Sequence, residues 1–208
     1  MEFGLSSEQI LLQDSVNRFL AEQVPLDVVR KMTADDSSDA ECWGGLTDLG
    51  IPGILISEAN GGLGLSSLDA AVVSELLGYH VTPSPFISSA VIAPATMQAA
   101  GRGEDLLGSV ATGEIRIGVA FAEGIGSRNN AGLSVDGGKI SGKSLFALDS
   151  DADYYLVSTG AQKIYLVKAN ARGLLRSNLR TVDRTRSTCE LTYDKVDAVL
   201  ISDDPEVF

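Results

Sequence analysis

The sequence predicts an α+β protein, with an N-terminal α-helical bundle over residues 1–112 followed by a small antiparallel β-barrel or sandwich domain over residues 113–208. Two observations lead to this division. After Gly113 the spacing of apolar residues changes from about 3.6, typical of helices, to about 2, typical of strands. The charge changes at the same place, because residues 1–112 carry 4 Lys and Arg against 15 Asp and Glu, and residues 113–208 carry 12 against 13. Both changes place a domain boundary near residue 112.

The first helix is predicted from its capping signal. The stretch Ser6–Gln9 is a capping box, in which the Ser6 side chain accepts from the Gln9 amide and the Gln9 side chain reaches back to Ser6. Pro25 ends or kinks this helix. Its apolar face is expected from residues at helical spacing, which are Leu12, Val16, Phe19 and Leu20.

Further helices are predicted from their end signals. One begins at Ser66 or Ser67 and ends at Gly78, because serine caps a helix start and glycine favours its end. Its apolar stripe is expected to be Leu68, Val72 and Leu76. The other helices are predicted over residues 40–49 with Gly50 as the cap, 87–100 with Pro94 inside, and 104–111.

The second half shows the period of strands. Apolar side chains alternate along the first strand, at Ile115, Ile117, Val119 and Phe121. The turn Asp136-Gly137-Gly138-Lys139 predicts a hairpin between short strands. A second strand pair, residues 154–158 and 163–167, is joined through Gly160, and late strands are expected at Leu191, Tyr193 and residues 196–201.

Composition excludes several classes of function. The net charge of −12 argues against a nucleic-acid partner, because phosphates would be repelled. No apolar stretch approaches the ~20 residues that a membrane span needs, and the polar N-terminus is no secretory signal. Cys42 and Cys189 form no CxxC, so buried thiols in a reducing, cytoplasmic setting are expected. His80 is the only histidine, which argues against a histidine-based metal site or a Ser-His-Asp triad, and no metal is expected.

Two interpretations are open for Gly61-Gly62-Leu63-Gly64, which precedes a predicted helix. Glycines before a helix are typical of a phosphate cradle. The stretch has neither the Gly-Lys-Ser/Thr ending of a Walker loop nor the GxGxxG spacing of a dinucleotide fold. A tight loop between two helices is therefore favoured. Glu58, just before it, is open to two interpretations, a buried functional carboxylate or the more common turn contact.

The order of motifs along the whole chain resembles the acyl-CoA dehydrogenase family. In the helical half the similar stretches are Trp43 to Ile51, Ile56-Ser57-Glu58, Gly61 to Gly64, Glu75 to Gly78 and Pro83 to Phe86. In the second half they are residues 113–127, 140–157 and 182–196. The resemblance implies that residues 1–112 are that family's N-terminal helical domain and residues 113–208 its middle β domain. Its C-terminal helical domain has no counterpart in the sequence.

The resemblance implies FAD-dependent α,β-desaturation of an acyl-CoA thioester, in fatty acid metabolism and lipid degradation. It also implies an electron acceptor of the electron-transfer flavoprotein type and a homo- or hetero-oligomer. No residue matches the catalytic base. Ser127 is in addition expected to contact the substrate's pantetheine arm, and Phe146 to cover one face of the flavin ring. The flavin-binding positions that the resemblance carries over are Phe121, Ala122, Gly126, Ser127, Phe146, Ala147 and Leu148.

The sequence also departs from the family pattern. Phe121-Ala122-Glu123-Gly124 stands where the family has Thr-Glu-Pro, and Leu148 stands where it has threonine, so two flavin-contacting hydroxyls are lost. Three hypotheses follow. The chain is an incomplete portion of the enzyme that by itself binds FAD weakly or not at all. Alternatively, it is a non-catalytic subunit that pairs with a complete dehydrogenase, or an acyl-thioester or partner-binding module.

Overall fold

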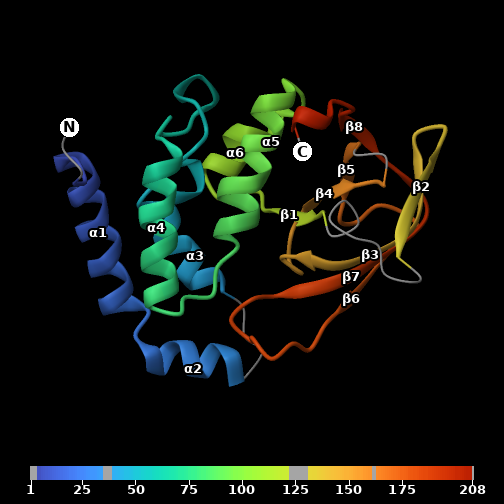
Figure 1. Cartoon of the computed structure of the whole chain (residues 1–208). Coiled ribbons are helices and arrows are strands. Elements are labelled where there is room, and N and C mark those ends of the chain that lie inside the picture. The colour runs from blue at the N-terminus through green and yellow to red at the C-terminus, as the bar shows by residue number, and fades with distance from the viewer. Residues whose placement is uncertain (1–3, 35–38, 122–130, 161–162, 208) are drawn as a thin grey trace.

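The chain folds into a helical part and a sheet part that lie side by side (Figure 1). The computed structural model describes residues 4–34, 39–121, 131–160 and 163–207. The predicted α+β class, with helices first and a mostly antiparallel sheet second, is confirmed. None of the described helices combines the length and the apolar character that crossing a bilayer requires.

The helical part contains six α-helices among the described residues and one π-helix. In chain order these are α1 (Ser7–Gln23), α2 (Leu26–Ala34), α3 (Ala40–Asp48), α4 (Ser67–Tyr79), the π-helix η3 (Phe86–Ile92), α5 (Ala93–Ala100) and α6 (Leu107–Ala111). Short 3-10 turns accompany them, namely η1 (Ile51–Gly53), η2 (Glu58–Asn60), η4 (Glu104–Leu106) and, after the sheet, η5 (Pro205–Val207).

The helix starts follow the predicted caps. At α1 the Gln9 amide donates to Ser6 Oγ at 3.2 Å, and the Ser6 amide donates to Gln9 Oε1 at 3.0 Å. Helix α4 starts in the same way, since the Ser66 amide donates to Asp69 Oδ2 at 2.8 Å. These side chains satisfy backbone donors that the first turn of a helix leaves without partners.

Three features of the helical part differ from the prediction. Helix α2 was not expected, and it begins directly after Pro25, whose carbonyl accepts from the Val28 and Val29 amides. Leu68 is 54% exposed, so the apolar stripe of α4 excludes it. The predicted helix over residues 87–100 starts as a π-helix and becomes α-helical at Ala93. Pro94 then falls in the first turn of α5, where a missing N–H costs nothing.

The described strands form one open sheet. They are β1 (Ile117–Ala120), β2 (Gly132–Asp136), β3 (Lys139–Leu148), β4 (Tyr154–Ser158), β5 (Ile164–Lys168), β6 (Leu174–Asn178), β7 (Thr188–Asp197) and β8 (Val199–Ser202). Their order is β6-β7-β3-β1-β4-β5-β8, with β2 paired to β3. All pairs are antiparallel except β1 with β4, which are parallel. The end strands β6 and β8 are not paired with each other, so the sheet does not close into a barrel.

A shared core joins the two parts. It combines apolar side chains of the helices with others from the strands, namely Ile56, Met97, Leu107, Val110, Ile117, Leu156 and Ile201. The π-helix η3 is also tied to β1, because the Ile117 amide donates to Ser89 Oγ at 3.1 Å. This packing fixes the start of β1, and with it the neighbouring end of β3, against the helices.

Candidate functional site

The second predicted flavin-binding stretch, Phe146 to Leu148, ends strand β3. The Phe146 side chain is 45% exposed, and Ala147 is fully buried in the sheet core. Leu148 is half-buried and lies opposite Val119 of β1. An aromatic ring and a leucine are therefore accessible at this end of the strand, whereas the Ala147 methyl group faces the core.

A β-bulge turns Phe146 outward. Strict strand alternation would place Ser144, Phe146 and Leu148 on one face, but Ser144 is fully buried while Phe146 is exposed. Along β7 the register moves two residues, from Leu191 to Cys189, while along β3 it moves three, from Ser144 to Ala147. The extra residue breaks the alternation, as bulges do, and re-aims a side chain.

The backbone of this segment is strained. Phe146 has a φ of 57° and Asp149 a φ of 68°, in the left-handed region that L-residues rarely occupy. Such a conformation costs about 1–2 kcal/mol for a residue with a side chain. Strained residues persist only where their surroundings hold them, and they gather at functional sites.

The first predicted flavin-binding stretch is described only at its beginning. Phe121 is half-buried and directly follows β1. Strand β1 runs antiparallel to β3, and Val119 lies opposite Leu148. The chain that continues from Val119 to Phe121 therefore runs along β3 in the direction from Leu148 to Phe146. The fold thus brings the beginnings of both predicted stretches together. Ala122, Gly126 and Ser127 lie outside the described residues.

Asp149 anchors the segment just past Leu148. Its amide donates to the Ser187 carbonyl at 3.0 Å, and its own carbonyl accepts from the Tyr155 hydroxyl at 3.0 Å. Burial is the main influence on Tyr155 and raises the pKa of its hydroxyl, which therefore stays a donor. The Asp149 carboxylate accepts from the Asp151 amide at 3.1 Å.

Arg116 links this carboxylate to the helical part. Its Nε and Nη2 donate to Asp149 at 3.0 and 2.8 Å, and its Nη1 and Nη2 donate to Asp39 at 2.7 and 3.1 Å. The side chains of Arg116, Asp39 and Asp149 are only 12%, 14% and 1% exposed. Burial alone would lower the pKa of Arg116, but the two carboxylates outweigh it and raise this pKa. Sequence reasoning missed Arg116 and Asp149, since their partners are distant in the chain.

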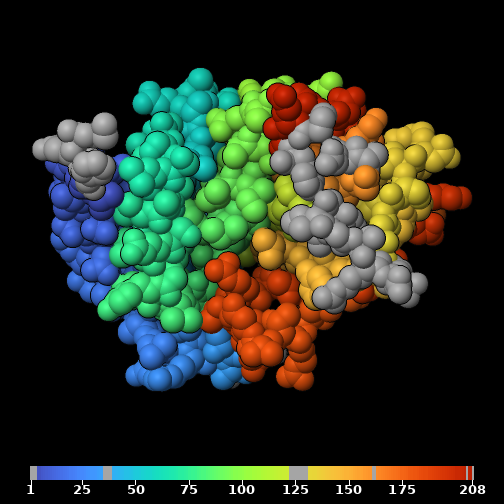
Figure 2. All heavy atoms as spheres, viewed as in Figure 1, coloured from blue at the N-terminus to red at the C-terminus, as the bar shows by residue number. Residues whose placement is uncertain are grey.

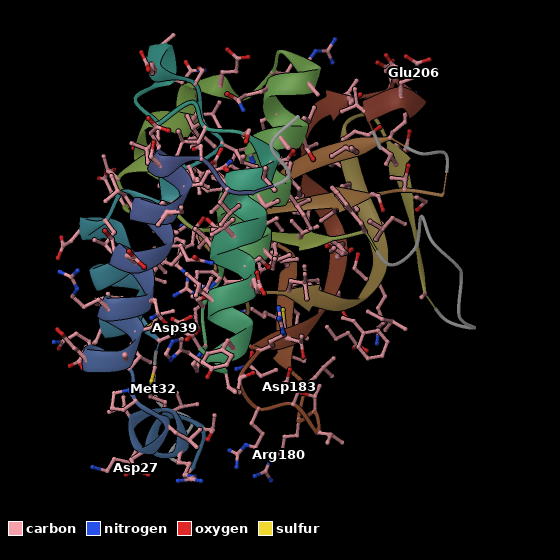
Figure 3. All side chains as sticks on the ribbon, turned by 60° about the vertical axis from the view of Figure 1, so that its left-hand side comes forward. Asp27, Met32, Asp39, Arg180, Asp183 and Glu206 are labelled. Carbon is pink, nitrogen blue, oxygen red and sulfur yellow. The ribbon has the colours of Figure 1, made fainter. Side chains whose placement is uncertain are left out.

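Two clefts flank the anchored segment. A small one, of about 80 Å³, lies between the helical stretch before η3 and the end of β3, and its lining includes Pro83, Pro85, Leu148, Asp149 and Ser187. A larger one, of about 560 Å³, separates Met32 of α2 from the connection between β6 and β7. Figure 2 shows that connection, in orange-red, next to the blue helix α2. Figure 3 shows Met32 on the helical side of the gap and Arg180 and Asp183 on the sheet side.

The glycine-rich stretch is a packed loop, as the sequence favoured. The Gly61, Gly62 and Gly64 amides donate to the carbonyls of Glu58, Ser57 and Ile56. A Cβ on Gly62 would lie 2.2 Å from the Ile56 carbonyl oxygen, so only glycine fits there. Because these amides are already used within the loop, they are not available to cradle a phosphate. Glu58 is exposed at the start of η2, in agreement with a turn contact.

Comparison with known proteins identifies relatives. Residues 6–106 match the family described as acyl-CoA dehydrogenase, N-terminal domain. A search of curated proteins finds no match. Among solved structures, the Tcur3481-Tcur3483 steroid ACAD (G363A variant) is 27% identical with a TM-score of 0.82, covering 94% of this chain and 57% of that one.

Two further structures share the fold at lower identity. The ChsE4-ChsE5 complex from Mycobacterium tuberculosis is 21% identical with a TM-score of 0.80, covering 98% of this chain and 59% of that one. An acyl-CoA dehydrogenase from Geobacillus kaustophilus is 17% identical with a TM-score of 0.82, covering 99% and 61%. The chain thus spans less than two thirds of the length of each of these relatives.

Proposed function

We propose that the chain serves in the FAD-dependent α,β-desaturation of an acyl-CoA thioester, because residues 6–106 match the acyl-CoA dehydrogenase N-terminal domain and the fold is shared with solved acyl-CoA dehydrogenases. The single observation that carries this proposal is Phe146, a half-exposed aromatic residue with a strained backbone at the position where the family resemblance expects a flavin contact. A core phenylalanine would be buried and unstrained.

The described residues fit an apolar contact with a flat ring. Phe146 offers an accessible aromatic face, Leu148 an apolar edge beside it, and Phe121 lies at the end of the adjacent strand. We propose that these residues hold and orient the isoalloxazine, with Ala147 contributing its backbone and Ala122, Gly126 and Ser127 completing the contact. When bound, FAD supplies the hydride acceptor for desaturation. This chain's own side chains would exclude water from the ring and set its orientation.

A second candidate function is a subunit of a hetero-oligomeric dehydrogenase. Two relatives are named as pairs of proteins, Tcur3481-Tcur3483 and the ChsE4-ChsE5 complex. Leu148 supplies no hydroxyl where the family has threonine, so flavin contacts at this end of β3 would rely on apolar surface and backbone. A chain that shares its flavin site with a partner subunit accounts for both observations. We also propose that an acceptor of the electron-transfer flavoprotein type takes the electrons from the reduced flavin.

Flavin content and acyl-CoA-dependent reduction test the proposal. The protein, expressed from its complete reading frame with and without the product of a neighbouring dehydrogenase gene, is purified and its bound flavin measured by absorbance. Acyl-CoA thioesters of different chain lengths and a steroid thioester are then added in the absence of oxygen and of any other electron acceptor, so that reduced flavin accumulates. Bleaching of bound flavin by a thioester supports the function, and a requirement for the second protein selects the subunit hypothesis. Absence of bound flavin under both conditions rejects both.

A further inference from the structure

We propose that Arg116 is a positioning residue for the end of β3. By holding Asp149, it keeps the strained segment that presents Phe146 in place, and it ties that segment to the start of helix α3. The part of this inference that concerns the flavin rests on the proposed function. The coupling itself rests on the geometry of the described residues.

The contact between Arg116 and Asp149 is directional. Two guanidinium nitrogens, Nε and Nη2, donate to the two carboxylate oxygens at 3.0 and 2.8 Å. A planar guanidinium that donates in parallel to both oxygens fixes the orientation of the carboxylate as well as its position. Because the Asp149 side chain is 1% exposed, removing the arginine leaves a buried carboxylate without these two donors.

Asp149 transmits this constraint to the strained segment. It lies three residues after Phe146, and both have positive φ. Its carboxylate also accepts from the Asp151 amide, and its backbone is held by Ser187 and Tyr155. If Arg116 is lost, the carboxylate must take up a proton or turn toward water. Either change frees one end of the segment whose other end is the bulge at Phe146.

The second arm of Arg116 extends to the helices. Its Nη1 and Nη2 donate to Asp39 at 2.7 and 3.1 Å, and Asp39 directly precedes α3. The Arg116 amide itself donates to Asp153 Oδ2 at 2.9 Å, which fixes the residue at the entrance to β1. Arg116 therefore fixes the position of Phe146 relative to both the sheet and the helical part.

The experiment compares variants of this ion cluster. Arg116→Met removes both arms, and Arg116→Lys keeps the charge but not the two-nitrogen contact. Asp39→Asn weakens the helical arm alone, and Asp149→Asn tests the charge, since asparagine tolerates positive φ. The matched control is Glu190→Gln, which weakens the 2.6 Å ion pair with Lys143 that links β3 to β7 next to the bulge but leaves the Arg116 cluster unchanged. Circular dichroism establishes which variants fold, and Arg116→Lys carries the test if Arg116→Met does not.

The first measurement needs no flavin. Hydrogen exchange is followed in peptides covering residues 144–151 of the 208-residue chain. We expect exchange there to rise at least about tenfold in Arg116→Met, the factor that corresponds to about 1.4 kcal/mol of local opening. Arg116→Lys should restore part of the protection, and Glu190→Gln should match the wild type. Unchanged exchange in a folded Arg116 variant overturns the proposal.

The second measurement uses the flavin-loaded protein. We expect Arg116→Lys to shift the visible flavin spectrum in the same direction as Phe146→Ala and to weaken FAD retention, while Glu190→Gln does neither. An Arg116→Lys spectrum and affinity equal to wild type overturn the positioning role. If the wild type from its complete reading frame binds no flavin, with or without the second dehydrogenase, while exchange rises as expected, the proposed function and the flavin part of this inference are refuted. The claim that Arg116 stabilises the segment from Phe146 to Asp149 is then still supported.

Discussion

Replacing Phe146 by alanine separates a surface role for this ring from a core role. Complete burial of a phenylalanine side chain contributes about 1.5–3 kcal/mol. Phe146 is 45% exposed, so roughly half of that contribution, about 1 kcal/mol, is lost in Phe146→Ala. Alanine inherits the φ of 57°, so the backbone strain is unchanged. We therefore expect Tm to fall by only about 2–4 °C in a chain of this size.

Phe86 provides the matched control. It is 1% exposed in the helical core, and its truncation to alanine should cost about 3–5 kcal/mol and lower Tm by about 6–20 °C. A third variant, Phe146→Gly, should be as stable as Phe146→Ala or more so, because glycine adopts positive φ without strain.

Two measurements distinguish the surface role of Phe146 from a core role. They are thermal unfolding, monitored by circular dichroism, and the content of bound flavin. The reasoning predicts a small loss of stability in Phe146→Ala together with a changed flavin spectrum. It is refuted if Phe146→Ala loses as much stability as Phe86→Ala, or if Phe146→Gly is clearly less stable than Phe146→Ala. A spectrum unchanged by Phe146→Ala would reject the flavin contact while leaving the estimate of stability intact.

Two pH effects follow from buried or capped groups. Burial raises the pKa of the Cys42 thiol to about 12 and that of Cys189 to about 11. The unfolded thiols ionise near pH 9, so the stability that Cys42 contributes is full below pH 9 and is lost as pH rises toward about 12. The free energy of unfolding in urea should therefore differ less between pH 8 and pH 10 in Cys42→Ala than in the wild type. Equal pH dependence in variant and wild type would contradict this. At α4 the hydrogen bond from the Ser66 side chain lowers the pKa of Asp69 below its usual 3.8. The stability that Asp69 contributes is therefore present above pH 3.8 and falls as pH drops through the lowered pKa. The free energy of unfolding should differ less between pH 5 and pH 3 in Asp69→Asn than in the wild type. An equal difference in the two proteins would show that the cap contributes nothing.

Features that depend on near neighbours in the chain were predictable from the sequence. The caps at Ser6 and Ser66 bond within one helical turn, and the hairpin turn at Gly137 and Gly138 has the positive φ values that the glycines indicated. In each case one short stretch carries both partners. Strand β6 was missed for the opposite reason, because its burial pattern is exposed along most of its length and offers no alternation.

The candidate site depends on pairings that no local pattern reveals. The bulge that exposes Phe146 arises from the register of β3 against β7, so alternation along β3 alone gave the wrong faces. Arg116 and its partner Asp39 are 77 residues apart, and Asp149 is 33 residues from Arg116. Only the assembled sheet and helices show that these charges meet beneath the segment that the family resemblance singled out.

The parallel pairing of β1 with β4 has a consequence for the order of folding. Strand β1 lies between β3 and β4, and all four of its residues are buried. It therefore completes its hydrogen bonds only after the chain beyond it has supplied a neighbour on each side. The hairpins β2–β3 and β4–β5 pair residues close in sequence and can form early, whereas insertion of β1 closes long loops and is slow. Strand β1, and with it the link from the sheet to the helical part, therefore follows these two hairpins in the order of folding.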